Sequence, residues 1–289
     1  MKKIKSKIIV GLIGFLVLLN VISWNEVSRL SVGHDLMVDF LNVGQGDSIF
    51  ITTPGNQQIL IDGGPNSSVL EKLNKEMPLY DKTIELVVLT HPEKDHLVGL
   101  FDVLKRYKVK NILWTGVIRN TSEWEEWKSL IKKEGANIII AKAGDQVVLQ
   151  KKEPAIFFDI LNPIGDIAGQ KFEDSNDTSA VLYLTVGKEK FLFVGDIGFE
   201  AEEQLLKGNI VADVLKIAHH GSKYSTSKEF LEQVSPRVAI ISVGENSYGH
   251  PTDELLARLD FFGIDIKRTD RDGDIKMFSN GKNIIIKTQ

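Results

Sequence analysis

The segment Thr90-His91-Pro92-Glu93-Lys94-Asp95-His96 gathers side chains that could bind a divalent cation. An apolar run typical of a β-strand (residues 84–89) leads into it, and an amphipathic helical pattern (97–107) leads out of it. Three candidate ligands, His91, Asp95 and His96, therefore lie at a strand-to-helix junction, with Glu93 as a fourth. A turn can converge side chains that a straight strand would point to opposite faces. The spacing predicts a metal site at this junction.

Other histidines and carboxylates stand in similar turns. The chain has six histidines, and all but His34 lie in polar or glycine-containing turns after expected strands. Asp196 follows the apolar run 191–194, and His219 and His220 follow the run 214–218. This nitrogen- and oxygen-rich set contains no sulfur, which suits Zn²⁺ or Mn²⁺ better than Ca²⁺ or Mg²⁺. Two such ions, bridged by one carboxylate, would activate a shared water and stabilise a developing oxyanion.

Composition narrows the class of protein. The chain has 289 residues and a net charge of -4, which argues against a strongly basic protein that coats nucleic acid. The charge does not exclude an enzyme acting on phosphodiesters, because bound divalent ions would cancel it locally. There are no cysteines, so disulfides and thiolate metal sites are excluded.

The N-terminus is expected to precede the folded domain. Residues 1–7 contain four lysines and form a basic cytoplasmic stub, and residues 8–24 are almost entirely apolar. A run of this length lies at the lower limit for a spanning helix, so it reads as a membrane anchor or as a cleaved signal segment. Trp24 suits an interfacial position and no Ala-x-Ala-like site follows, which favours a single-pass anchor with the rest of the chain outside the cell membrane. The alternative is secretion after cleavage. Residues 25–35 read as a linker.

Residues 36–289 read as one α/β domain. Strand-like runs at 36–41, 48–52 and 58–61 form an antiparallel meander by their turn chemistry. A β/α alternation follows to about residue 142, and a second batch of strands and helices fills the remainder. Two batches of strands flanked by helices suggest two sheets packed face to face, with their ends opening on one edge. Asp47 and Asp62 end strands beside glycine, where a carboxylate either satisfies turn amides or joins the site.

The motifs together resemble the metallo-β-lactamase fold superfamily. The resemblance is carried by His91-x-Glu93-x-Asp95-His96, Gly195-Asp196 and His219-His220-Gly221-Ser222. The additional segments Asn42-Val43-Gly44-Gln45-Gly46-Asp47-Ser48, Leu60-Ile61-Asp62-Gly63-Gly64, Asn246-x-Tyr248-Gly249-His250-Pro251 and Arg268-Thr269-Asp270-x-x-Gly273 look like the C-terminal hydrolase domain of the ComEC/Rec2 DNA-uptake (competence) proteins. This resemblance covers roughly residues 36–289. It implies an αββα four-layer sandwich, two divalent metal ions and a nuclease role on incoming DNA.

The resemblance also implies a role for each residue. His91 and Glu93 would serve the first metal, Asp95 and His96 the second, Asp196 would bridge them, and one of His219 and His220 would complete the second site. Asp62 would orient a ligand, and His250 would contact the scissile phosphate or protonate the leaving oxygen. Asp47, Asn176 and Ser222 would line the substrate pocket. The catalytic set is then Asp95, His250 and Asp62.

Two positions depart from the superfamily pattern. Glu93 stands where the superfamily has histidine. The superfamily also has a histidine before the bridging aspartate, but none occurs between His96 and Asp196, so Asn176 or Asp177 would have to replace it. The first metal site should therefore be weaker, tolerant of Mn²⁺, or filled only with substrate present.

These features lead to three hypotheses of function. The first is a membrane-anchored, metal-dependent phosphodiesterase, in the first place a nuclease acting on DNA beside a separate uptake channel. The second keeps the metal but changes the substrate to a lactam, lactone or thioester. The third is a non-catalytic DNA-binding subunit in which the first metal site is a relic.

Overall fold

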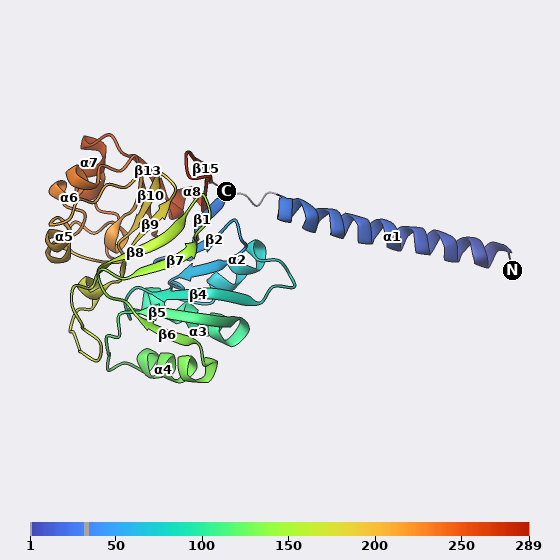
Figure 1. The fold of residues 1–289 in the computed structure, drawn as a ribbon, viewed down its shortest axis with the longest axis horizontal. Helices are drawn as coiled ribbons and strands as arrows, with labels where there is room; N and C mark the ends of the chain where they lie inside the picture. Colours follow the sequence, from blue (N-terminus) through green and yellow to red (C-terminus); the bar gives the residue numbers. More distant parts are fainter. Residues whose placement is uncertain (1, 32–34, 289) are drawn as a thin grey trace.

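Two mixed β-sheets form the centre of the computed structural model, which describes residues 2–31 and 35–288 (Figure 1). The first sheet has eight strands in the order β15-β14-β1-β2-β3-β4-β5-β6. Its strands are β1 (Leu36–Phe40), β2 (Ile49–Thr52), β3 (Gln58–Ile61), β4 (Thr83–Leu89), β5 (Lys108–Trp114), β6 (Asn137–Ile140), β14 (Ile275–Ser279) and β15 (Ile284–Thr288). The pairs β1–β2 and β2–β3 are antiparallel, which confirms the predicted meander.

The second sheet has seven strands in the order β13-β12-β11-β10-β9-β8-β7. They are β7 (Gln146–Gln150), β8 (Ile156–Asn162), β9 (Val181–Val186), β10 (Glu189–Phe193), β11 (Val214–Lys216), β12 (Val238–Ile241) and β13 (Asp265–Arg268). Strands β10 to β13 run parallel, whereas β7 to β10 pair antiparallel. Both sheets are therefore mixed.

Alternating side chains divide the domain into layers. In β4, Leu86 and Val88 enter the core between the sheets, while Val87 and Leu89 enter the core beneath the helices. The helices over the first sheet are α2 (Ser68–Glu76), α3 (Lys94–Arg106) and α4 (Ser122–Glu134). Those over the second sheet are α5 (Phe199–Leu205), α6 (Lys228–Val234) and α7 (Asp253–Phe261). Three apolar cores thus hold four layers together, as the two batches of strands predicted.

The last part of the chain crosses from one sheet to the other. The chain after α7 consists of β13, the short helix α8 (Thr269–Asp272), and the hairpin β14–β15. Strand β14 pairs antiparallel with β1, so the C-terminus lies beside the first strand of the domain. This crossover ties the two sheets to each other.

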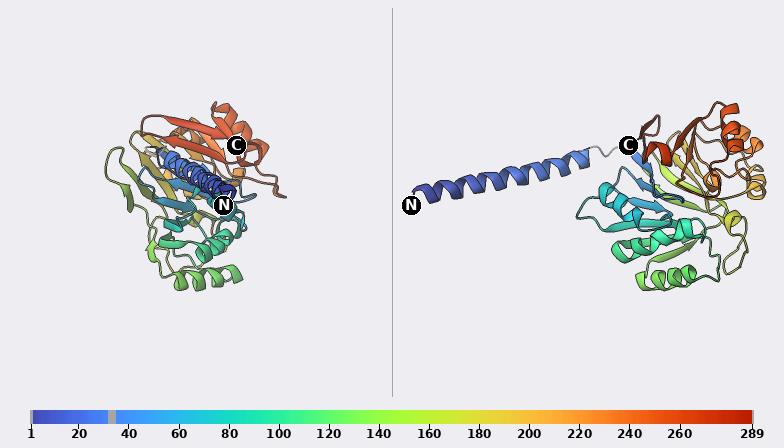
Figure 2. Two further views of the ribbon diagram at one scale, coloured as in Figure 1. Left: turned by 90° about the vertical axis from the view of Figure 1, so that its right-hand side faces the viewer. Right: turned by 180° about the vertical axis from the view of Figure 1, so that it is seen from behind.

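The N-terminal segment forms one long helix, α1 (Lys2–Ser31), which projects away from the sheets (Figures 1 and 2). It contains the apolar run 8–24 and continues through 25–31, so most of the expected linker is helical. In the described part of the chain, no helix is long and apolar enough to cross a membrane, and the expected spanning anchor is therefore not confirmed. His34, within the expected linker, lies outside the described residues.

The carboxyl ends of parallel strands bring the motifs together. Strands β3 and β4 are parallel in the first sheet, and β10, β11 and β12 are parallel in the second. The segments after them carry Asp62, His91, Asp196 and His220. Because these ends share one rim of the sandwich, side chains far apart in the sequence meet there.

Candidate metal centre

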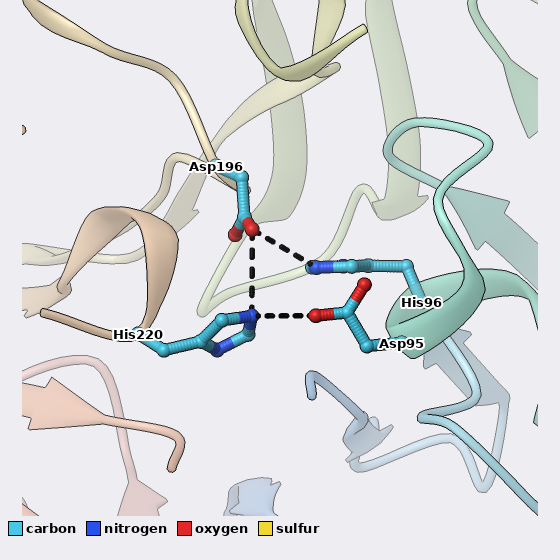
Figure 3. A group of neighbouring side chains, drawn as sticks. All are labelled: Asp95, His96, Asp196 and His220. Atoms are coloured by element: carbon cyan, nitrogen blue, oxygen red, sulfur yellow. Dashed lines mark hydrogen bonds and ion pairs between the residues drawn. The ribbon is translucent and has the colours of Figure 1, made fainter. Parts of the chain in front are cut away.

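Four ligand atoms, one from each of Asp95, His96, Asp196 and His220, lie within 4.8 Å of one another at this rim (Figure 3). Asp95 and His96 come from the first turn of α3, and Asp196 follows β10. The Oδ2 atom of Asp196 lies 3.3 Å from His96 Nε2 and 3.4 Å from His220 Nε2. The Oδ2 atom of Asp95 lies 3.1 Å from His220 Nε2. Two imidazole nitrogens and two carboxylates thus face one point.

The outer nitrogen of each imidazole is held by another residue. His96 Nδ1 donates to Asp62 Oδ2 at 2.8 Å, and His220 Nδ1 donates to the Ser242 carbonyl at 2.8 Å. Thr90 Oγ1 donates to the same Asp62 oxygen at 2.7 Å, and it therefore accepts from His91 Nδ1 at 3.0 Å. These contacts orient the rings of His96 and His220 so that each Nε2 faces the site, the arrangement expected around metal-binding histidines. Asp62 thus accepts hydrogen bonds from both Thr90 and His96.

Unusual backbone angles aim the ligands. His219 and His220 both adopt left-handed φ angles, 51° and 52°, directly after β11, and Asp62 has a φ of 58° after β3. Such angles are costly for residues other than glycine and occur mainly at functional sites. Gly195 has a φ of 56°, and a Cβ there would lie 2.8 Å from the Ser179 side chain. The close approach brings Asp196 to the rim, where its amide donates to Ser179 Oγ at 3.2 Å.

A buried lysine lies under the cluster. Lys216, at the end of β11, is 1% exposed, and its ammonium contacts Asp47 Oδ2 and lies 3.7 Å from Asp196 Oδ1. It also donates to the Gly195 carbonyl at 3.2 Å. Burial alone would lower the pKa of Lys216, but Asp47 and Asp196 outweigh it and raise the pKa, so the group stays charged. Sequence reasoning missed this residue, although a lysine inside the apolar run 214–218 was a visible signal.

The buried charges strongly perturb one another in the metal-free protein. Burial opposes ionisation of Asp196, yet the charges of His220 and His96 hold its pKa well below the usual range. Burial would also lower the pKa of His220, but Asp196 and Asp95 outweigh it and raise the pKa to about 10. The pKa of His96 is likewise raised against burial, by Asp196 and Asp62. These opposing shifts show that the carboxylates attract a positive charge to this point.

The donor set fits a bound divalent cation. Among the buried polar atoms of the described residues, His91 Nε2, His96 Nε2 and Asp196 Oδ1 have no hydrogen-bond partner, a costly state unless a ligand uses them. Two imidazoles and two carboxylates without sulfur suit Zn²⁺ or Mn²⁺. The group Asp95, His96, Asp196 and His220 would hold such an ion.

A family model described as the metallo-beta-lactamase superfamily matches residues 41–245, more than half of the chain. The chain belongs to the metallo-beta-lactamase superfamily. The matched region contains five of the eight strands of the first sheet, six of the seven strands of the second, and all four residues of the cluster.

Three curated proteins, from Bacillus subtilis, Neisseria gonorrhoeae and Haemophilus influenzae, are similar in sequence to this chain. ComE operon protein 3 of Bacillus subtilis (strain 168) is 33% identical over 259 residues, which cover 83% of this chain and 32% of the relative. Competence protein ComA of Neisseria gonorrhoeae is 29% identical, covering 84% of this chain and 32% of that protein. Recombination protein 2 of Haemophilus influenzae (strain ATCC 51907 / DSM 11121 / KW20 / Rd) is 28% identical, covering 83% and 28%. The chain spans about a third of the length of the curated relatives it matches.

The residues expected to bind the first superfamily metal are only partly assembled. The ring of His91 lies 4.2 Å from that of His96, with its Nε2 buried and unpartnered. Glu93, by contrast, points to Arg119 and Ser175, and it belongs to neither potential ligand group among the described residues. Asp177, one of the two expected substitutes for the missing histidine, accepts from the Gly198 amide through its Oδ1.

A cavity of about 610 Å³ opens above the cluster. Its lining includes Asn176 and His250, as expected for substrate-binding residues. Asp47 and Ser222 do not line it: Asp47 lies beneath with Lys216, and Ser222 Oγ accepts from the Tyr224 amide. The complete lining is Gln45, Pro65, Glu93, Lys94, Asp95, Arg119, Glu173, Asp174, Asn176, Asp196, His219, His220, Tyr248 and His250.

The two histidines of the His219-His220 pair face different surroundings. His220 enters the ligand cluster, whereas the His219 ring lies on the cavity wall, 5.5 Å from the ring of His250. His250 is held by Asn246, which accepts from its amide and donates to its carbonyl. Its Nδ1 is buried without a partner, and burial together with His219 and His220 lowers its pKa. A neutral imidazole therefore faces the cavity beside the cluster.

Proposed function

We propose that the chain is a metal-dependent hydrolase that cleaves phosphodiester bonds, with DNA as its substrate. The observation that carries this proposal is the convergence of four ligand atoms within 4.8 Å beneath a 610 Å³ cavity. Relatedness to competence proteins favours nucleic acid as the substrate, in an uptake-like context beside a separate channel.

In this proposal each residue of the cluster has one task. Asp95, His96, Asp196 and His220 hold the ion, while Asp62 keeps the His96 ring in the orientation that presents Nε2. A divalent cation bound there supplies Lewis acidity, which eases deprotonation of water and draws charge from a phosphoryl oxygen. A second ion would use His91 and Asp196, and this position should be the weaker one.

His250 is proposed to serve the leaving group. It lies on the cavity wall beside His219, close to the cluster but outside it. From this position its neutral imidazole would donate a hydrogen bond to a phosphoryl oxygen or to the leaving oxygen. His219, on the same wall, would position that oxygen.

The decisive experiment measures cleavage of single-stranded and duplex DNA, and of a bis-aryl phosphate, by the protein loaded with Zn²⁺ or Mn²⁺. Chelation and Asp95→Ala should each abolish turnover. The variant Asp265→Ala, whose carboxylate pairs with Lys267 on the edge strand β13, serves as the matched control. Hydrolysis of lactams, lactones or thioesters without phosphodiester cleavage would contradict the proposal. So would DNA binding without turnover by metal-loaded protein.

We also propose that α1 keeps the hydrolase domain at a cell membrane. Large apolar side chains from Val10 to Trp24 are exposed along this helix, and the lysines that precede them suit an anionic cytoplasmic surface.

A further inference from the structure

We propose that Arg119 binds the substrate phosphate and that Glu93 is its positioning residue rather than a metal ligand. This inference rests on the proposed phosphodiesterase function. The family resemblance implied that Glu93 is a ligand of the first metal. Here Glu93 instead positions Arg119, a residue outside the motif of residues 91–96.

The contacts of Glu93 point away from the ligand cluster. Its Oε1 accepts from Ser175 Oγ at 2.5 Å and lies 2.9 Å from Arg119 Nη2. Glu93 precedes α3 as its N-cap residue but makes no side-chain cap hydrogen bond, so the carboxylate is committed to these two partners. A carboxylate held in this way fixes a guanidinium in one orientation.

The backbone holds Arg119 from the other side. Its Nη1 donates to the carbonyls of Phe172 and Glu173, at 3.1 and 2.9 Å. The neighbouring residue Ile118 pairs with Lys171 through an isolated β-bridge, which fastens this segment to the loop that carries both carbonyls. A guanidinium has five N–H donors, and the contacts with the two carbonyls and with Glu93 together occupy only some of them. Donors therefore remain for a ligand.

Arg119 is placed where an anionic substrate needs a cation. It lines the same cavity as Asp95 and Asp196, and its side chain is 17% exposed. The cavity wall is rich in carboxylates, which repel a phosphodiester. Of the lysines and arginines that the structure describes, only Lys94 and Arg119 line it, and Lys94 is 70% exposed and paired with Glu123. A fixed, partly buried guanidinium is the group best suited to grip two phosphate oxygens.

The test uses the full metal-loaded chain and four variants: Arg119→Ala, Arg119→Lys, Glu93→Gln, and the double variant Glu93→Gln/Arg119→Ala. We expect Arg119→Ala to raise KM for a bis-aryl phosphate by about tenfold or more, the usual effect of losing a charged hydrogen bond. KM for a neutral aryl ester should not change. Arg119→Lys should recover part of the loss, since it keeps the charge without the fork.

Glu93 should act only through Arg119. Glu93→Gln should raise KM less than Arg119→Ala does, and it should add nothing when Arg119 is already alanine. The bound metal per chain, measured by elemental analysis, should equal that of the unaltered protein. The control Arg237→Ala removes an arginine–aspartate pair that does not line the cavity, and it should change neither quantity.

Two results would overturn the inference. Loss of bound metal in Glu93→Gln would make Glu93 a ligand, and an unchanged KM in Arg119→Ala would remove the arginine from substrate binding. If the proposed function itself is wrong, the unaltered protein will show no phosphodiester turnover. In that case calorimetric binding of inorganic phosphate to the metal-loaded protein tests Arg119 directly: weaker binding by Arg119→Ala supports its role, and equal binding refutes it.

Discussion

At Asp196 the opposing charges of the site meet on one carboxylate. Its Oδ2 faces the imidazoles of His96 and His220, and its Oδ1 faces Lys216. The ammonium thus compensates Asp196 and Asp47 from below, while the side towards the cavity remains for a divalent cation. This division explains how so many carboxylates share a buried space.

Replacing Lys216 should therefore expose the cost of these buried charges. Lys216→Met would leave Asp47 and Asp196 without their cation, a loss of about 3–5 kcal/mol in the free energy of unfolding of the metal-free protein. Urea denaturation measures it. Added Zn²⁺ or Mn²⁺ should restore part of the loss, because it supplies positive charge to Asp196. Equal stability of the variant and the unaltered protein would refute the compensating role of Lys216.

Metal binding should release protons. In the metal-free protein the pKa of His220 is raised to about 10 and that of His96 is also raised, so both are charged at pH 7. An imidazole must be neutral to ligate, hence a cation would displace about two protons, and its affinity should rise with pH. Calorimetry in buffers of different ionisation enthalpy counts the protons. A heat independent of the buffer would show that these histidines do not ligate.

The buried carboxyl of Asp39 should lower the free energy of unfolding as pH rises. Its carboxyl is fully buried in β1, and burial together with Glu76 and Asp274 raises its pKa to about 7 against the attraction of Lys276 and Lys72. The folded protein then binds a proton that the unfolded chain releases above about pH 4, so stability falls between about pH 4 and pH 7. The full shift from 3.8 to about 7 corresponds to at most about 4 kcal/mol.

The variant Asp39→Asn isolates this effect. Its amide resembles the protonated carboxyl but does not titrate, so the free energy of unfolding should depend less on pH between 4 and 7. The variant should also be the more stable protein at pH 8. Chemical denaturation across this range measures both quantities, and parallel pH curves for the two proteins would contradict the assignment.

The candidate metal ligands could be predicted from residue types and their positions in the sequence. The charged side chains that contact them or line the cavity could not. Histidine and aspartate after apolar runs gave the cluster of Asp95, His96, Asp196 and His220, because strand ends share a rim. Lys216 and Arg119 were not predicted as site residues, because each contacts residues distant in sequence, such as Asp47 and Glu93. The ambiguity between His219 and His220 depended on two left-handed φ angles, which no propensity of histidine reveals.

Helix α3 brings the first two ligands to the site by an unusually close approach to the loop after β3. A Cβ at Gly99 would lie 1.9 Å from the Gly63 carbonyl, and a Cβ at Gly63 would lie 2.4 Å from the Leu100 amide. Backbone hydrogen bonds join the same segments, from Gly63 to His96 and from Gly99 to Gly64. The two glycines therefore set the distance between Asp62 and the ligands of α3.

Gly99→Ala should push α3 away from this loop. The added methyl group meets backbone rather than a flexible side chain, so we expect a loss of about 2–4 kcal/mol in the free energy of unfolding. The affinity for metal should fall with it, by about 10- to 100-fold, because the contact of His96 with Asp62 is stretched. Gly55→Ala is the control, since its Cβ would meet only Thr53 Oγ1 at 3.8 Å. Isothermal titration and urea denaturation report the two effects, and unchanged metal affinity would separate α3 packing from ligand placement.

Hydrophobic periodicity predicted most helices and strands, but it did not predict which strands pair with each other. The apolar run of β4 and the amphipathic pattern of α3 are local properties, and both elements are found where the sequence suggested. The pairing of β14 with β1 joins residues more than two hundred positions apart, and no local pattern encodes it. The same holds for the continuation of α1 to Ser31, where polar residues read as a linker but remain helical.

On the scale of the whole molecule, the two sheets divide the work of the site. The first sheet and its helices supply Asp62, His91, Asp95 and His96, and the second supplies Asp196 and His220. Neither half holds a complete ligand set, so metal binding should join them. A bound cation should accordingly raise the thermal midpoint of the whole domain, as mass action requires for a ligand of the folded state.

Helix α1 carries the last prediction, which concerns location. Its exposed apolar side chains include Leu12, Leu16 and Leu19, and we expect the full chain to sediment with cell membranes. Leu16→Lys removes apolar surface and places a charge among these side chains, so it should shift protein to the supernatant. Ile164→Lys, on an exposed apolar position of the hydrolase domain, should not.

Mass spectrometry of the N-terminus separates an anchor from a cleaved signal, since cleavage would remove the residues up to about Trp24. Unaltered protein found entirely in the supernatant with its N-terminus intact would contradict membrane association.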